Sequence, residues 1–279
     1  MEIGIVGLGL IGGSLGLDLR SHGHHVLGVS RKPETCDRAL ERGVVDDASV
    51  SLTLMQQTDA VFICTPLAAM KATVMALLPE LSENTVLTDV GSVKGWVMET
   101  IAPLWPNFVG GHPMAGTAES GIEAAQLGLF ADAAYVLTPT AATPVAAIQT
   151  IEALVRPLRV RIYQCTPEAH DRAVAWISHL PVFSSASLIA ACLSEPDLTV
   201  LELAMELASS GFRDTSRVGG GNPELGRMMA HYNKAALLRS LHSYREVIDQ
   251  TIAQIDQEDW STIESQLQRT QQGRSSFVQ

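Results

Sequence analysis

The sequence predicts an α/β protein, in which a domain with a parallel sheet is followed by an all-helical domain. Three observations support this prediction. Short β-branched runs alternate with helical stretches from Met1 to about Cys165, a glycine-rich segment directly follows the first run, and the β-branched runs stop after Thr166-Pro167. Strands that alternate with helices form βαβ units, whose parallel sheet is covered on both faces. We therefore expect two domains, residues 1–165 and 166–279.

The first domain contains seven short apolar runs that we expect to be strands. They are Glu2–Val6, His25–Val29, Ala60–Cys64, Val86–Val90, Phe108–Gly110, Tyr135–Thr138 and Arg161–Tyr163. The segments between them carry apolar residues at every third or fourth position, as in Ile11–Arg20 and Ala68–Leu78. That spacing predicts helices.

The second domain is expected to be helical. Its predicted helices are Glu168–Cys192, Asp197–Ser209, Glu224–Asp256 and Asp259–Gln272. Pro167 suits a first helical turn, whereas Pro181 lies inside a predicted helix and is expected to kink it. The polar, glycine-rich segment Ser210–Pro223 contains two arginines. We expect it to be a functional loop, because conspicuous loops on a helical scaffold often carry function.

Composition narrows the class of protein. The chain has 279 residues, 46% of them hydrophobic, and a formal net charge of −11. The apolar fraction excludes disorder, and the acidic balance disfavours a nucleic-acid partner. No basic leader precedes the first strand, and no run reaches the roughly 18 apolar residues of a membrane helix. The scattered cysteines are Cys36, Cys64, Cys165 and Cys192. They predict free thiols in a reducing cytoplasm, with no metal site.

A dinucleotide-binding motif follows the first predicted strand. Gly7-Leu8-Gly9-Leu10-Ile11-Gly12 leads from that strand into a helix. In a Rossmann-type domain the first glycine makes the tight turn, the second lets backbone N–H groups approach a pyrophosphate, and the third lets helix and strand pack closely. The phosphates then lie at the positive end of the helix, beside Leu10 and Ile11. The alternative is a glycine-rich turn that only packs.

The residues after the second and third predicted strands suggest which dinucleotide binds. An NAD site usually carries Asp or Glu at the end of the second strand, but this chain has Ser30-Arg31-Lys32. A hydroxyl, a guanidinium and an ammonium suit a 2′-phosphate, so we expect NADP; the alternative is a solvated basic loop. Thr65 and Pro66 are expected to line the nicotinamide side, unless they are an ordinary loop start.

Two further strand ends carry candidate catalytic groups. Ser92 lies in Asp89-Val90-Gly91-Ser92-Val93-Lys94, where it is either a helix N-cap or a hydroxyl facing substrate. His112 lies in a segment with glycines on both sides, which leaves room for a ligand to approach. Neutral imidazole suits the base that takes a hydroxyl proton as hydride leaves an alcohol. The alternative is a histidine that stabilises a turn.

The helical half offers a histidine and two arginines. His179 precedes Pro181, and on its own pattern it is interpreted as a core histidine. Arg213 and Arg217 flank Asp214, and arginine forks suit a substrate carboxylate. Spacing leaves open an alternative, in which Asp214 forms an ion pair with either arginine.

The combined motifs resemble the prephenate/arogenate dehydrogenase family of tyrosine biosynthesis. They are GLGLIGGS, DVGSVK, GGHPMAG, ISHLP and GFRDTSRVGGGNPE, which extend in the family's order from Gly7 to Glu224. The basic residues after the second strand look most like those of the NADP-dependent arogenate dehydrogenases of photosynthetic bacteria.

The resemblance implies roles for individual residues. His112 takes the proton of a cyclohexadienyl ring hydroxyl while hydride passes to the nicotinamide, and Ser92 supports the same hydroxyl. His179 lies near the substrate, Arg217 holds a substrate carboxylate, and Arg213 is a second cation. Family members often carry an acid where this chain has Ala118, with Glu119 one residue later. An ion pair that gates the site through that acid is therefore not expected from this chain's residues.

The resemblance also implies a dimer that forms through the helical domain, which would bind the substrate as well. One stripe at helical spacing suits either a dimer interface or an internal core; it consists of Leu237, Leu238, Leu241, Tyr244 and Ile248.

The resulting hypothesis is NADP-dependent oxidative decarboxylation of L-arogenate to L-tyrosine. The close alternative is prephenate, which gives 4-hydroxyphenylpyruvate and differs by a ketone in place of the amine. Asp214 or Glu119 would suit that amine. Two more distant alternatives remain: a β-hydroxyacid or imine reductase, for which Lys234 is the only lysine after residue 94, and an NADP-sensing regulator without turnover.

Overall fold

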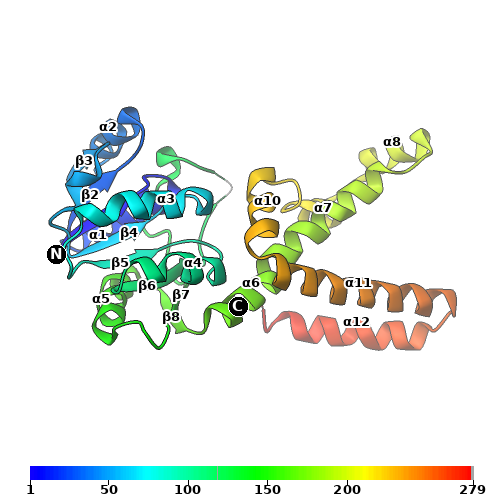
Figure 1. Cartoon of the computed structure of the whole chain (residues 1–279). Coiled ribbons are helices and arrows are strands. Elements are labelled where there is room, and N and C mark those ends of the chain that lie inside the picture. Colours follow the sequence, from blue (N-terminus) through cyan, green and yellow to red (C-terminus); the bar gives the residue numbers. More distant parts are fainter. Residues whose placement is uncertain (118, 278–279) are drawn as a thin grey trace. The chain divides into compact units, whose positions relative to one another are not determined.

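The computed structural model describes residues 1–117 and 119–277, which form two compact units. The first comprises Met1–Val174 and Gly221–Asn233, and the second comprises Ala175–Gly220 and Lys234–Gln279. An eight-stranded sheet of order β3-β2-β1-β4-β5-β6-β7-β8 forms the centre of the first unit (Figure 1). Its strands are β1 (Glu2–Val6), β2 (His25–Val29), β3 (Asp47–Ser49), β4 (Ala60–Ile63), β5 (Val86–Asp89), β6 (Phe108–Pro113), β7 (Ala134–Thr138) and β8 (Arg161–Gln164). The predicted α/β class is confirmed.

The predicted parallel sheet is wrong at one pair of strands. β6 and β7 run antiparallel, with Gly110 opposite Thr138 and Pro113 opposite Tyr135. The described residues of the connection between them form the short 3₁₀ turn η4 (Ile122–Ala124) and no crossover helix. Only a crossover returns the chain for parallel pairing. This pairing also lengthens β6 beyond the expected Gly110, so His112 lies within the strand. The short, polar strand β3 was not predicted.

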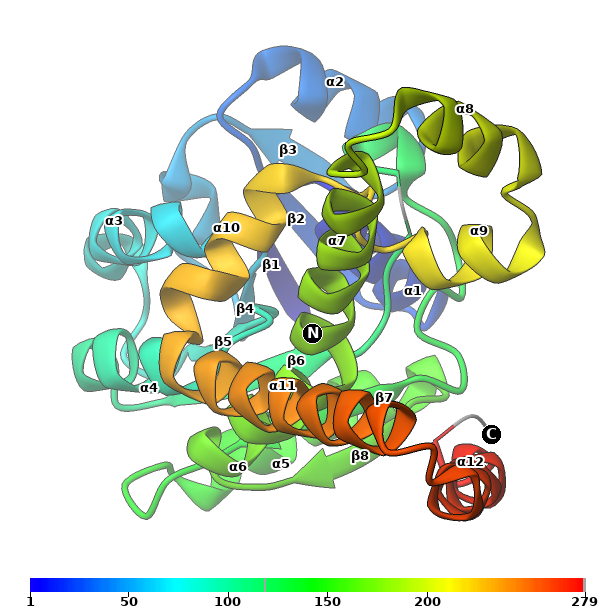
Figure 2. The ribbon, with the colours of Figure 1, turned by 90° about the vertical axis from the view of Figure 1, so that its right-hand side faces the viewer.

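Helices cover both faces of the sheet. α1 (Leu10–Ser21), α2 (Pro33–Glu41) and α5 (Val145–Val155) pack on one face; α3 (Leu67–Leu77) and α4 (Gly95–Thr100) pack on the other. Figure 2 shows α3 and α4 on one side of the strands and α1 on the other. Successive strand residues alternate between the two cores, because side chains of a strand point to opposite faces. Ile5 packs with Leu15 of α1, and Val6 packs in the cluster that contains Val74 of α3.

The segment Gly221–Asn233 belongs to the first unit, although it follows the expected boundary at residue 165. It contains α10 (Pro223–Tyr232), whose Tyr232 ring meets the ring of Trp96 on α4 edge-on, with centroids 4.8 Å apart. Asn233 Nδ2 donates to the carbonyl of Asp171, at 2.9 Å, on α6 (Pro167–Val174). The predicted single helix Glu224–Asp256 is therefore wrong. It is interrupted at Asn233, where the backbone leaves helical geometry.

The second unit is helical. Its elements are the π-helical segment η6 (Ala175–His179), α7 (Leu180–Leu193), α8 (Leu198–Leu207), α9 (Ser210–Ser216), α11 (Lys234–Asp256) and α12 (Trp260–Arg274), and α11 and α12 lie side by side (Figure 1). The α-helical pattern expected across Glu168–Cys192 is interrupted by η6, just before Pro181. Proline has no N–H to donate to the carbonyl four residues earlier, and a wider turn accommodates that loss. The expected loop Ser210–Pro223 is wrong in its first half, which forms α9.

Many apolar side chains of the second unit are exposed within the single chain. Leu198 and Leu207 are each 70% exposed, and Trp260 is 58% exposed. The continuous helical stretch Pro167–Leu193 is long and apolar enough to cross a membrane by length and composition, and little of it is buried within the chain. Core helices of soluble proteins pass the same test, so this property alone is weak support for a membrane span.

Asp18 of α1 is a buried carboxyl that contacts the β6–β7 connection, and the dependence of stability on pH tests its burial. Its Oδ1 accepts the N–H of Gly128 at 2.7 Å, and its Oδ2 is shielded from solvent with no hydrogen-bond partner among the described residues. Burial raises the pKa of this carboxyl, against the opposing effects of the Gly128 N–H and His22. The folded state therefore binds the proton more tightly than the unfolded state, and it loses stability as pH rises through the raised pKa.

We expect Asp18→Asn to gain stability relative to the parent chain as pH rises from about 4 to about 7, because asparagine cannot ionise. Urea unfolding of both chains at the two pH values measures this difference. Asp37→Asn, at an exposed position of α2, is the control. A stability difference between parent and Asp18→Asn that is the same at both pH values contradicts the prediction.

Candidate active site

The turn between β1 and α1 has the geometry of a phosphate cradle. Gly7 adopts a φ of 108°, which favours glycine, and its N–H donates to the carbonyl of Val29 at 2.8 Å. A Cβ on Gly12 would overlap the carbonyl oxygen of Gly7, whereas the space around Gly9 is open. Gly9 is the N-cap of α1 and offers no side chain to the first-turn N–H groups, which include those of Leu10 and Ile11. The turn therefore fits an anion.

The neighbouring strand ends extend this cradle. β1 lies between β2 and β4, so the order of the strands reverses at β1: β2 and β3 lie on one side of it and β4 on the other. In such sheets a crevice for ligands opens beyond the carboxyl ends of the strands at this point. After β2, Arg31 and Lys32 are exposed, Ser30 is half-buried, and neither cation pairs with a carboxylate among the described residues. After β4, the shielded Thr65 Oγ1 has no hydrogen-bond partner among the described residues, and Pro66 is the N-cap residue of α3. These residues fit a dinucleotide.

A buried ion pair lies beyond β5. Asp89 and Lys94 are fully buried, and the Lys94 ammonium contacts Asp89 Oδ2 directly. Asp89 also accepts the N–H groups of Gly91 and Gly111, at 2.7 and 3.1 Å, and Lys94 Nζ donates to the carbonyl of Gly111 at 2.6 Å. Burial lowers the pKa of Lys94, and the charges of Asp89 and Asp171 oppose that shift. The pair thereby holds both backbone groups of the residue before His112.

Ser92 lies between the two members of this ion pair. The N-cap role considered for Ser92 is wrong, because α4 begins at Gly95 and its N-cap residue is Lys94. The backbone N–H groups of Lys94 and Gly95 instead donate to the Asp171 carboxylate of α6, at 2.7 and 2.8 Å. A distant carboxylate therefore caps α4, and the Ser92 hydroxyl is not used for capping.

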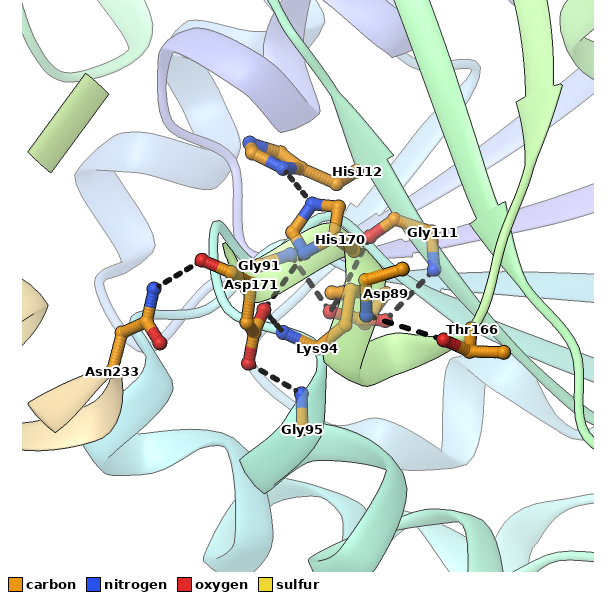
Figure 3. A network of polar contacts seen from close by, with 11 residues as sticks. Asp89, Gly91, Lys94, Gly95, Gly111, His112, Thr166, His170, Asp171 and Asn233 are labelled. Carbon is orange, nitrogen blue, oxygen red and sulfur yellow. Dashed lines mark hydrogen bonds and ion pairs between the residues drawn. The ribbon is translucent and has the colours of Figure 1, made fainter. Parts of the chain in front are cut away.

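His112 of β6 is linked to a second histidine and a carboxylate (Figure 3). His112 Nδ1 lies 2.8 Å from His170 Nε2, and His170 Nδ1 lies 2.7 Å from Asp171 Oδ1. The exposed fractions of the three residues are 8%, 2% and 8%. The turn role considered for His112 is wrong, because the residue lies in a strand. A buried histidine linked to a second imidazole and a carboxylate is suited to act as a base.

The glycines before His112 serve packing rather than ligand access. A Cβ on Gly111 would lie 2.7 Å from the backbone oxygen of Asp89 and 3.3 Å from the ring of Tyr135. A Cβ on Gly110 would overlap Thr138 Oγ1. The interpretation that these glycines leave room for a ligand is therefore wrong for both positions, although Gly116, after His112, has open space around it.

The remaining candidates lie in the second unit. His179 is fully buried in η6, whereas Arg213 and Arg217 are exposed at the end of α9. Ser185 of α7 links the helix that follows His179 to the segment around Arg217: its Oγ donates to the carbonyl of Thr215 at 2.7 Å and accepts the N–H of Gly219 at 3.0 Å. Arg213 Nε lies 3.2 Å from Asp214 Oδ1, so the ion pair considered for Asp214 does form with Arg213, and it is exposed.

Sequence reasoning missed His170, Asp171, Lys94 and Asn233. His112 and His170 are 58 residues apart and meet only because α6 packs beside β6 and β7. The available signal was an adjacent His-Asp pair at a predicted helix start, which is too common to single out. Glu119 is exposed, and Ala118 lies outside the described residues.

Family comparisons match the two parts of the chain separately. The sequence model of the prephenate dehydrogenase nucleotide-binding domain matches residues 15–164, and that of the prephenate dehydrogenase dimerization domain matches residues 166–269. Prephenate dehydrogenase of Bacillus subtilis (strain 168) is 32% identical over 266 residues, which are 91% of this chain and 70% of that protein.

Solved structures of similar proteins cover nearly the whole chain. Synechocystis arogenate dehydrogenase is 52% identical with a TM-score of 0.93, and the match covers 100% of both chains. Prephenate dehydrogenase from A. aeolicus, in complex with hydroxyphenyl propionate and NAD⁺, is 26% identical with a TM-score of 0.92, over 99% of this chain and 98% of that one.

The Asp89–Lys94 pair provides a test of the site's framework. Lys94→Met leaves the Asp89 carboxylate buried without its cation, which costs about 3–5 kcal/mol of unfolding free energy. Asp89→Asn should destabilise the parent chain but restore part of the loss in Lys94→Met, because it removes the unpaired charge. Denaturant unfolding measures the free energy of unfolding of the parent, the two single variants and the double variant. Lys71→Met, at an exposed lysine of α3, is the control, and equal effects of Asp89→Asn in both backgrounds contradict the prediction.

Proposed function

The chain belongs to the prephenate dehydrogenase family, and on that premise we propose that it converts L-arogenate to L-tyrosine by NADP-dependent oxidative decarboxylation. Membership makes the chain a dehydrogenase with a nicotinamide dinucleotide cofactor, which removes the grounds for a sensing regulator or an imine reductase. The observation that carries the choice of arogenate is the 52% identity, over full length, to Synechocystis arogenate dehydrogenase. Prephenate stays as the second candidate, because the B. subtilis and A. aeolicus relatives are named for it.

His112 is the proposed base. Its Nε2 takes the proton of the ring hydroxyl, and the Ser92 hydroxyl holds the same oxygen. The nicotinamide ring supplies the hydride acceptor when the cofactor is bound. Loss of carbon dioxide then makes the ring aromatic, which drives the reaction forward. The main task of this chain's residues is therefore to orient the ring hydroxyl of the substrate and to accept its proton.

The cofactor-binding residues are proposed from the cradle. Gly7, Gly9, Leu10, Ile11 and Gly12 would hold the pyrophosphate by backbone N–H groups. Thr65 Oγ1 would gain a hydrogen-bond partner on the nicotinamide side, where Pro66 also lies. Ser30, Arg31 and Lys32 would hold a 2′-phosphate. We propose residues 1–165 as the NADP-binding domain on this basis.

The substrate-binding residues and the dimer are proposed for residues 166–279. Arg217 would bind a substrate carboxylate, with Arg213 as a second cation and His179 near the ring. The matched dimerization domain supports a homodimer through these helices, and the exposed apolar side chains of the second unit suit burial against a second copy. That burial would also cover the apolar stretch Pro167–Leu193. The proposed location is the cytoplasm, with no membrane or nucleic-acid partner.

Steady-state kinetics of the purified protein with both substrates tests the reaction. NADPH formation should show a kcat/KM for arogenate at least about tenfold above that for prephenate, a difference of about 1.4 kcal/mol in transition-state binding. A tenfold preference for prephenate would overturn the choice of substrate and leave the dehydrogenase class intact.

Arg31 tests the choice of cofactor. Arg31→Ala removes a cation that pairs with no carboxylate in the described part of the chain. The Kd for NADP⁺ should therefore rise about tenfold or more, while the Kd for NAD⁺ stays within about twofold. Fluorescence titration of the ligand-free protein measures both constants. Arg161→Ala, at an exposed arginine of β8, is the control. Comparable binding of the two dinucleotides before and after the change would contradict the NADP assignment.

A further inference from the structure

Three buried side chains, His112, His170 and Asp171, form a hydrogen-bonded row from β6 to α6 (Figure 3). We propose that His170 and Asp171 fix the tautomer of His112 and stabilise the positive charge that His112 gains when it takes the substrate proton. Both residues act through His112, so they are positioning residues. The inference rests on the proposed function, in which His112 is the base.

The Asp171 carboxylate is held as an ionised acceptor. It accepts the backbone N–H groups of Lys94 and Gly95 at 2.7 and 2.8 Å, and it lies 2.7 Å from His170 Nδ1. Two of these donors are the N–H groups at the start of α4, where the helix dipole favours negative charge. Backbone N–H groups can only donate, so both oxygens of Asp171 act as acceptors in these contacts.

An ionised Asp171 determines the tautomers along the row. A carboxylate can only accept, so His170 carries its proton on Nδ1 and keeps a lone pair on Nε2. That lone pair faces His112 Nδ1 at 2.8 Å and requires a proton there. Neutral His112 then keeps its own lone pair on Nε2, the nitrogen that the proposed reaction needs as the base.

The charges of the groups around this row cancel or are absent, so Asp171 is the charge that acts on His112. Asp89 and Lys94 form a pair whose charges cancel, and Cys64 and Tyr135 beside Asp89 stay neutral because burial raises the pKa of each. Cys165, near His170 and Asp171, stays neutral because burial and the Asp171 charge raise the pKa of its thiol. With both histidines neutral, these buried side chains together carry the one negative charge of Asp171. Protonation of His112 would balance that charge.

The backbone around the two positioning residues is also held in place. The N–H of His170 donates to the carbonyl of Thr166 at 3.0 Å, and the Asp171 carbonyl accepts Asn233 Nδ2 at 2.9 Å. The end of α10 therefore also holds the backbone of α6 at Asp171. These contacts keep the imidazole of His170 at a fixed distance from His112.

Kinetics of His170→Leu tests the proposal, because this change leaves the contacts of Asp171 with α4 intact. With NADP⁺ and the substrate that the parent prefers, kcat should fall about a hundredfold, while KM changes less than about threefold. The acidic limb of the kcat/KM profile should move to lower pH. The control is His25→Gln, which removes an exposed histidine 2.6 Å from Glu2 at the opposite end of the strands. Rates and pH profile equal to those of the control would overturn the proposal.

Nitrogen NMR of ¹⁵N-histidine-labelled protein without ligands gives a readout that does not depend on activity. The parent should show His112 protonated on Nδ1, a signal assigned by its loss in His112→Asn, and His170→Leu should shift that population toward Nε2–H. An unchanged His112 tautomer in His170→Leu would overturn the proposal. If the parent oxidises neither cyclohexadienyl substrate, the proposed function fails, and this tautomer measurement still decides the role of His170.

Discussion

The buried Asp89–Lys94 ion pair is the interaction on which the candidate site at the ends of β5 and β6 depends. Buried charges are tolerated only when every donor and acceptor around them is satisfied. Here the partners are backbone groups of Gly91 and Gly111. The pair therefore ties the end of β5 to β6 and holds the Ser92 segment between its two members. The position of His112 follows from an electrostatic constraint on the neighbouring strand.

The Asp171 carboxylate likewise connects separate elements of the first unit. Asp171 caps α4 from α6 and at the same time meets His170, which meets His112. One side chain thus links the N-terminus of α4 to the His170 imidazole, and through it to His112. The Asp171 carboxylate accepts the N–H groups at the start of α4, which explains why this short helix has no capping side chain of its own.

The chain supplies the first unit from two separate stretches of sequence. Gly221–Asn233 returns to it through the contacts of Tyr232 with Trp96 and of Asn233 with Asp171. The cofactor cradle and the His112 row therefore share a unit with a segment that follows the arginines Arg213 and Arg217. A change in the path of that segment would reach α6 directly, because Asn233 Nδ2 donates to the backbone carbonyl of Asp171.

The sequence by itself predicted every strand except β3, most helices and the glycine-rich turn, because periodicity and turn chemistry are local. Strand ends and the family resemblance together pointed to Ser92, His112 and Arg217 as candidate residues. It did not determine the antiparallel direction of β7, the break at Asn233 or the contacts of Asp171. Each of these depends on contacts between residues far apart in the chain, 58 residues in the case of His112 and His170. Only the tertiary structure places those groups within hydrogen-bond distance, and it also assigns Gly110 and Gly111 to packing, since no sequence pattern specifies what lies opposite a missing Cβ.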